Sequence, residues 1–322
     1  MIAPPYDEIL GKQSECSDLE SSSDRAVIKE ASLSTSDYQK IVKLIVDQVK
    51  ATFASKFTSP EMFSEVPLNH LQRANMAIDL YIQRREIRPV GEILINAKVE
   101  FMEQMQFRKK AFIQNTDILM FFSDFAKLEC GEKMFLFRHF WPQFSTFANA
   151  IVSMQVFARY PDKFYYIVSE NKAIDTCSDV CTNLSYLQGY APEAIELLKK
   201  PLAFLIDKIF NPIKQLNLDR TECAYITLQI LWSQKKKPGL SAATEEMMDR
   251  LLREINTEMH HYYVYEKKIS DYVFRMSEMM KLIMVCFKHC QNLRETVMAA
   301  KTFNLFESLY NESEVSSLVG VV

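Results

Sequence analysis

The stretch FAKLECGEKMFLFRHFW, residues 125–141, carries two groups of bulky apolar side chains, one on each side of a Gly-Glu-Lys break. A helix that buries one face shows a single apolar stripe with a period of about 3.6 residues. This stretch instead needs apolar contacts before and after the break, and it ends in Trp141. It therefore predicts a junction between two helices with both sides buried.

Composition indicates a globular chain with a large core. Of its 322 residues, 48% are hydrophobic and 12% are aromatic. A net charge of −3 and a pI of about 6.0 provide no basic surface for phosphate groups, so we expect no direct nucleic-acid contact. The seven cysteines include no Cys-x-x-Cys pair, which favours free thiols in a reducing compartment. With no secretory or membrane-spanning pattern, we expect an intracellular, soluble protein without membrane contact.

The start of the chain differs from the rest in composition. Residues 1–37 are acidic, rich in Ser and poor in large apolar groups, so we expect a disordered leader. Apolar residues then recur at three- and four-residue steps, and a helix should begin near Ser36. We interpret residues 38–64 as an additional helix or hinge, 65–312 as the main domain and 313–322 as a tail.

Helical periodicity dominates the remaining chain. It predicts helices over residues 67–86 and 93–122, and β-prone residues 164–168, followed by a polar turn, predict one short β-hairpin with 173–176. LNLDRTECAYITLQILW, residues 216–232, is apolar nearly all round, as a fully buried helix would be. Two amphipathic helices follow, which apolar positions indicate within residues 247–259 and 272–287. The pattern predicts an all-α fold with one small β-hairpin.

Motifs for enzyme chemistry are missing from the sequence. Six glycines are too few and too scattered for a phosphate-binding loop or a dinucleotide fingerprint. Neither a Gly-x-Ser-x-Gly nor a His-Glu-x-x-His motif is present. His260 and His261 fall at the polar edge of a predicted helix, which favours a surface position over acid–base work. We predict no enzyme activity and no cofactor.

Two cysteine clusters have a spacing that would place their side chains close together. Cys286, His289 and Cys290 fall within one helical turn, and Cys177 with Cys181 would share a face. Free cysteines usually pack as small hydrophobic residues, and a closed zinc site needs four ligands. Packing is the favoured interpretation for both clusters, and no metal site is predicted.

The opening stretch resembles a known family signature. Leu128 lies at +3 from Phe125, Leu136 at +11 and Trp141 at +16, similar to the Phe-x-x-Leu-x-x-x-Asp-Gln-x-x-Leu-Leu signature of nuclear-receptor ligand-binding domains. LNLDRTECAYITLQILWSQKKKPGLS, residues 216–241, resembles the eighth helix of that family and its Gly-Leu-Ser entry into the ninth. HHYYVYEKKISDYVFRMSEMMKL resembles the long tenth helix. The resemblance covers about residues 65–312 and is closest to the expanded nuclear hormone receptors of nematodes.

The resemblance implies a fold and a function. The fold would be a three-layer antiparallel helical sandwich. The chain would be the ligand-binding and coregulator-binding module of a nuclear hormone receptor that regulates transcription by RNA polymerase II, located in the nucleus and also in the cytoplasm. Implied partners are a small lipophilic ligand, coregulator peptides, and a homo- or heterodimer partner on the tenth helix. The alternative is a receptor-derived helical interaction scaffold without ligand response or direct DNA binding.

The resemblance also implies site residues, assigned by offset from the signature. A largely apolar cavity of a few hundred Å³ would hold the ligand, and the ligand-binding residues would be Phe107, Ala111, Ser145, Thr146, Asn149 and Val152. An apolar groove would take an amphipathic Leu-rich helix, and its residues would be Met120, Phe125, Leu128, Lys133, Leu136 and Glu307. Structural roles fall to Trp141, Glu222 and Arg275.

Glu222 has two compatible interpretations. The resemblance pairs it with Arg275 on the tenth helix. Its spacing from Asp219 alone predicts a capping arrangement at the start of a helix, which stabilises by roughly 1 kcal/mol. Both roles can hold at once.

Departures from the family pattern matter for the implied sites. Met120 stands where the family has a clamp Lys on helix three, so a bound peptide helix would lose a cationic cap. Val152 stands where some relatives have an Arg that holds acidic ligands, so carboxylate recognition is not implied there. Gln143 replaces a Glu found in heterodimerising receptors. The DNA-binding module of the family needs Cys-x-x-Cys pairs, which this sequence lacks, so the chain is either a receptor variant without it or part of a longer receptor.

Overall fold

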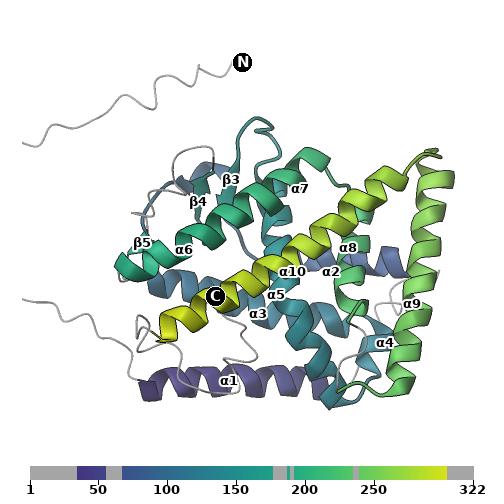
Figure 1. The fold of residues 1–322 in the computed structure, drawn as a ribbon, viewed down its shortest axis with the longest axis horizontal. Helices are drawn as coiled ribbons and strands as arrows, with labels where there is room; N and C mark the ends of the chain where they lie inside the picture. The colour runs from purple at the N-terminus through teal and green to yellow at the C-terminus, as the bar shows by residue number, and fades with distance from the viewer. Residues whose placement is uncertain (1–34, 56–66, 177–186, 189–191, 235–238, 303–322) are drawn as a thin grey trace, which may run out of the picture. The chain divides into compact units, whose positions relative to one another are not determined.

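Helices make up most of the computed structural model, which describes residues 35–55, 67–176, 187–188, 192–234 and 239–302 (Figure 1). The helices are α1 (Thr35–Ala54), α2 (His70–Arg84), α3 (Phe101–Met120), α4 (Ser123–Ala126), α5 (Cys130–Val156), α6 (Pro192–Leu205), α7 (Asn211–Leu216), α8 (Arg220–Trp232), α9 (Ala242–His261) and α10 (Val273–Thr302). A 3-10 turn (Val90–Glu92) and two π-helical turns (Ile206–Phe210 and Tyr262–Glu266) complete the helical part. None of the helices in these ranges combines the length and apolarity needed to cross a membrane.

The helices stack in layers around α5 and α8. On one side, α5 packs against α3 and α8 packs against α2. On the other side both helices contact α10, which crosses them in Figure 1 and also packs against α6. α9 contacts both α2 and α8. This arrangement confirms the predicted helical sandwich.

The expected hairpin is present and belongs to a small sheet. β3 (Tyr165–Ile167) pairs antiparallel with β4 (Lys172–Asp175), placing Tyr166 opposite Ile174. β1 (Leu94–Ile95) lies parallel to β4 on its other side, and β2 (Val99–Glu100) pairs with β5 (Leu187–Gln188). The helix predicted over 93–122 was therefore wrong at its start, because residues 94–95 and 99–100 form strands and α3 begins at Phe101.

The signature stretch forms the junction between α4 and α5, as predicted. Phe125 before the break and Leu136 after it are both fully buried. The break itself lies earlier than expected, at residues 127–129, and Gly131 belongs to the first turn of α5. A helix can start there because Lys133 N–H already donates to the carbonyl of Glu129.

The two sequence blocks that carry the family resemblance meet in space. The carboxylate of Glu132 in α5 accepts a hydrogen bond of 2.9 Å from the backbone N–H of Ser241, the N-cap of α9. Gly239 has a φ of +124°, and a Cβ there would come within 2.7 Å of the Phe135 ring. Only glycine fits both the backbone conformation and the close approach. The Gly-Leu-Ser entry thus packs on the signature helix.

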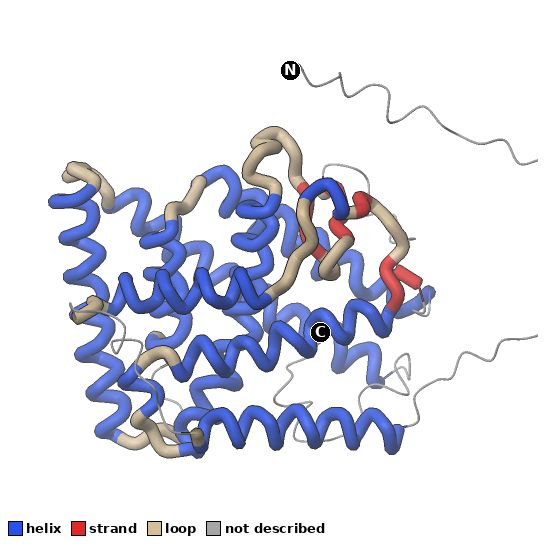
Figure 2. Tube along the Cα trace, turned by 180° about the vertical axis from the view of Figure 1, so that it is seen from behind, coloured by secondary structure: helices blue, strands red, loops and turns tan. Residues whose placement is uncertain are grey.

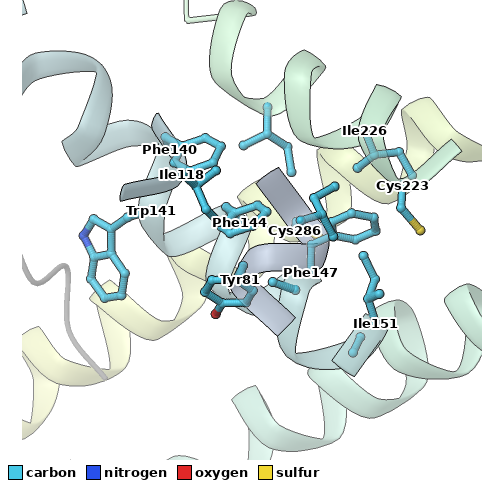
Figure 3. Close-up of a cluster of buried hydrophobic side chains, with 14 of the residues drawn as sticks. Tyr81, Ile118, Phe140, Trp141, Phe144, Phe147, Ile151, Cys223, Ile226 and Cys286 are labelled. Atoms are coloured by element: carbon cyan, nitrogen blue, oxygen red, sulfur yellow. The ribbon is translucent and has the colours of Figure 1, made fainter. Parts of the chain in front are cut away.

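Aromatic side chains of α5 join the layers at the core (Figure 3). Phe144 meets Tyr81 of α2 edge to face, with ring centroids 5.4 Å apart, and stacks on Phe140 at 4.8 Å. Trp141 packs edge-on against Phe112 of α3 at 4.9 Å. Cys286 brings α10 to the same cluster. Such ring pairs add roughly 0.5–1.5 kcal/mol beyond the burial of their area.

Glu222 holds both roles that its sequence context allows. Its backbone N–H donates to Asp219 and its carboxylate accepts from the Asp219 N–H, which forms a capping box at the start of α8. The same carboxylate, 1% exposed, pairs with Arg275 of α10 through an Nη2–Oε2 contact of 2.6 Å. Nε of Arg275 also donates to this carboxylate, and the Tyr263 hydroxyl donates a further hydrogen bond of 2.6 Å. Burial, together with the carboxylate, raises the pKa of Tyr263, so this hydroxyl remains a donor.

Breaking this network should destabilise the fold in a coupled way. We expect Arg275→Ala to lower the free energy of unfolding by about 3–5 kcal/mol, because it leaves a buried carboxylate without its cation. Glu222→Ala should cost a similar amount, and the double variant should cost less than the sum by at least about 1 kcal/mol. Urea unfolding of the three variants measures this coupling. Strict additivity would show that the pair does not act as a unit.

A control for the Glu222 and Arg275 variants lies on the same helix as Arg275. Lys281 pairs with Glu278 on α10, and its side chain is 64% exposed. Lys281→Ala should change the unfolding free energy by less than about 0.5 kcal/mol.

Candidate functional site

A buried polar cluster lies where α2, α3, α5 and β3 meet. Arg85 is the C-cap residue of α2 and is only 2% exposed. Its guanidinium lies over the Phe107 ring of α3, 3.9 Å from the centroid. Its Nη2 donates to Oδ1 of Asn149 on α5 at 3.1 Å. A cation from α2 therefore reaches the space between α3 and α5.

Further amide and hydroxyl groups lie between α5 and its neighbours β3 and α3. The Asn149 amide contacts the hydroxyl of Tyr166 on β3 at 3.4 Å. Nδ2 of Asn115 on α3 donates to Oγ of Ser145 on α5 at 2.8 Å. Burial raises the pKa of Tyr166, so the phenol stays protonated and offers a hydrogen-bond donor. The cluster combines several neutral polar groups with one positive charge.

The charge of Arg85 is incompletely satisfied. Its Nε and Nη1 are buried and have no hydrogen-bond partner among the described residues, and the same holds for Oδ1 of Asn115. Within the described ranges, no carboxylate forms an ion pair with Arg85. Buried charges in proteins are normally paired and hydrogen-bonded, since an uncompensated one is costly. The open N–H groups of Arg85 are the kind of donor that an anion accepts from.

An open cavity of about 620 Å³ has Phe107 in its wall. Its other lining residues are mostly charged or polar and include Arg88, Lys110, Ser169 and Glu170. Lys110 spans it with a 2.9 Å ion pair to Glu170. This cavity differs from the apolar one expected between α3 and α5, because the α5 residues do not line it. Phe107 both lines this cavity and contacts Arg85, which is not itself a lining residue.

The predicted ligand-binding residues divide between this cluster and the core. Phe107 and Asn149 contact Arg85, and Ser145 is hydrogen-bonded to Asn115 on the neighbouring helix. The remaining three lie elsewhere: Ala111 and Val152 are buried in the core, and Thr146 lies beside Cys290 of α10 and donates to the carbonyl of Pro142.

Sequence reasoning missed Arg85, although a signal for it existed. Ala74, Ala77, Ile78 and Tyr81 are the buried stripe of α2, and Arg85 continues that stripe one turn beyond Tyr81. Its neighbour Arg84 points outward to Asp117 with a 2.8 Å ion pair. The helical period alone distinguishes the buried arginine from the exposed one.

The predicted coregulator surface is covered by α1, which packs against α3 and α5. Phe53 of α1 lies edge-on to Phe125 and Phe137, with ring centroids 5.5 Å away in both cases. Nζ of Lys133 donates to the backbone carbonyl of Phe53 at 2.9 Å. Burial lowers the pKa of Lys133. Figure 2 shows α1 as the straight helix along the lower edge of the molecule.

The other predicted groove residues lie on the same elements. Leu136 is fully buried in α5, whereas Met120 at the end of α3 and Leu128 in the turn before α5 are partly buried against the core. Gln143 is turned to its own helix and donates to the carbonyl of His139. Glu307 lies outside the described residues.

The side chains of Cys286, His289 and Cys290 on α10 are all buried. Cys286 and Cys290 are buried, and burial raises the pKa of Cys290 to about 11. Burial also lowers the pKa of His289 to about 4. Across the described ranges, no three His, Cys, Asp or Glu side chains are grouped to hold a metal ion. Cys177 and Cys181 lie outside these ranges, and His260 and His261 are exposed, as expected.

Comparison with known proteins agrees with this architecture. A family model described as the ligand-binding domain of nuclear hormone receptor matches residues 92–303. Nuclear hormone receptor family member nhr-54 of Caenorhabditis elegans is 26% identical over 227 residues, covering 67% of this chain and 53% of that protein. Member nhr-127 of the same organism is 26% identical over 210 residues, covering 64% and 58%, and member nhr-213 is 22% identical over 256 residues, covering 77% and 59%.

The chain spans little more than half the length of these curated relatives. The match runs from the 3-10 turn before β1 to the end of α10. It includes the α3, α5 and β3 residues of the polar cluster and the α3–α5 surface under α1, whereas Arg85 precedes it. The predicted resemblance is confirmed, and this chain belongs to the nuclear hormone receptor ligand-binding domain family.

Proposed function

We propose that this chain is the ligand-sensing and coregulator-binding part of a nuclear receptor that regulates transcription by RNA polymerase II in the nucleus. Family membership supports the receptor role. The observation that carries ligand sensing is the buried Arg85, whose Nε and Nη1 have no hydrogen-bond partner among the described residues. A protein that keeps such a cation in its core needs an anion to complete it.

The ligand class follows from the chemistry of the cluster. A guanidinium binds carboxylates through parallel hydrogen bonds, and it does so most strongly away from water. Phe107 offers an apolar ring face beside it, and Asn149 and Tyr166 offer further polar contacts. A lipophilic molecule with one carboxylate fits this set. Arg85, at the end of α2, would then hold the ligand carboxylate. In some relatives an Arg at the position of Val152 on α5 holds acidic ligands.

A partner on α10 is supported by its exposed apolar residues. Met284 and Phe287 are 72% and 41% exposed, and they lie one helical turn apart. Large apolar side chains gathered on one exposed face often mark an interaction site. We propose that α10 carries the dimer contact.

The alternative remains a helical interaction scaffold without ligand response. One observation favours it: Ala111 and Val152, expected to face a ligand, are buried among protein side chains. In the receptor function Arg85 binds the ligand, whereas in the scaffold function it binds none. Substituting Arg85 therefore distinguishes the two functions.

In the ligand-free chain, Arg85→Met should leave stability unchanged or raise it by up to about 3 kcal/mol. Methionine fills a similar volume and removes an uncompensated buried charge, which outweighs the lost hydrogen bond to Asn149. Arg84→Met is the matched control, since this neighbour is exposed and its ion pair should contribute less than about 1 kcal/mol. Urea unfolding measures both. A loss of several kcal/mol for Arg85→Met would instead make Arg85 a structural residue.

Dodecanoic acid should stabilise the wild-type chain in thermal unfolding, and dodecanol should do so much less. A ligand at about 100 times its Kd adds roughly 2.7 kcal/mol of stability. Arg85→Met should weaken binding of the acid by about thirtyfold or more, since a charged hydrogen-bonded partner is lost, while Arg84→Met should bind it normally. Equal responses to acid and alcohol would argue against carboxylate recognition. If neither compound, nor a wider lipid and steroid panel, stabilises the chain, the scaffold function is favoured.

A further inference from the structure

We propose that α1 is a built-in helical ligand of the coregulator surface on α3 and α5, and that an amphipathic coregulator helix binds there by displacing it. This inference rests on the proposed coregulator-binding function. It adds that the surface is already occupied by a segment of the same chain. It also specifies the kind of helix that the surface accepts.

The side chains of α1 divide into a buried face and an exposed face. Ile45, Val46, Val49 and Phe53 are each 9% exposed or less. Lys43 and Leu44, which precede them, and Asp47, Gln48 and Lys50, which lie between them, are all exposed. Apolar positions at i, i+1, i+4 and i+8 form the stripe that an amphipathic helix presents to a groove. α1 therefore binds as a peptide helix would.

Phe53 anchors the C-terminal end of α1. Its ring is 1% exposed and stands edge-on between Phe125 of α4 and Phe137 of α5. Aromatic anchors in fully desolvated pockets carry much of the affinity of a helix interface. Phe125, the first residue of the family signature, therefore forms part of the pocket that binds Phe53.

Lys133 caps the same end of the helix. α1 has no basic residue in its own last turn, and its C-terminal carbonyls carry a partial negative charge. Lys133 is 5% exposed, and its ammonium donates a hydrogen bond of 2.9 Å to the Phe53 carbonyl. The cationic cap that Met120 does not supply from α3 therefore comes from α5. A competing helix should likewise end with free carbonyls facing Lys133.

Because α1 belongs to the same chain as the surface it covers, it lowers the apparent affinity of any competing helix by mass action. A tethered helix has an effective concentration of roughly 1 mM. If its intrinsic Kd is about 10 µM, it is docked about 99% of the time and lowers the apparent affinity of a competitor about a hundredfold. A substitution that releases α1 should restore that affinity.

The test uses three full chains: wild type, Val49→Asp and Leu44→Asp. Val49 is 2% exposed and faces the surface, whereas Leu44 on the same helix is 66% exposed. The probes are a fluorescent peptide of residues 35–55 with the wild-type sequence and a Leu-rich coregulator-type peptide, titrated by anisotropy. We expect Val49→Asp to bind both at least tenfold more tightly than wild type, and Leu44→Asp to bind like wild type. Thermal unfolding verifies that each variant keeps its fold.

Equal affinities for the 35–55 peptide in all three folded chains would overturn the inference. If Val49→Asp binds the 35–55 peptide but no Leu-rich peptide, α1 is a built-in helix and the coregulator part of the proposed function fails. A second measurement needs no variant: hydrogen exchange of the wild-type amides in residues 44–53 should accelerate when a Leu-rich peptide saturates the chain. Unchanged exchange with the peptide bound would also overturn displacement.

Discussion

The structure depends on one constraint, which is that α5 is covered on nearly all sides and must satisfy its polar side chains through other elements. Five of them do so across element boundaries. Ser153 accepts a 3.0 Å hydrogen bond from the Ile167 N–H of β3, and the other four reach α9, α1, α3 and the end of α2. Because an unsatisfied buried polar group costs roughly 1–3 kcal/mol, these contacts fix where each neighbour packs. Both candidate sites are consequences of this requirement.

How much could be read from the sequence depended on whether a feature is local. The signature junction, the buried α8 and the capping box at Asp219 follow from spacing within one segment, and the structure has them all. The strands at residues 94–95 and 99–100 were missed because each is only two residues long. A pair of residues shows no period, and β4 and β5, far away in sequence, decide their conformation.

The same distinction explains what was missed in the sites. Periodicity indicates which face of α2 or α1 is apolar, yet it does not indicate which element covers that face. Arg85 reaches Asn149, and Phe53 reaches Phe125, across long separations in the chain. The family pattern supplied positions on α3 and α5 but not these partners, since both come from helices before the matched region.

Three of the buried charges in the described ranges, Glu222, Lys133 and Arg85, differ in how they are compensated. Glu222 has a cation, a tyrosine hydroxyl and one backbone N–H around it, as a structural charge requires. Lys133 has a helix carbonyl, a partner that can leave if α1 leaves. Arg85 has one amide and the faces of two rings, Tyr81 and Phe107, while its Nε and Nη1 have no hydrogen-bond partner among the described residues. Since each uncompensated group raises the free energy of the folded chain, the least satisfied charge is where a further molecule gains most by binding.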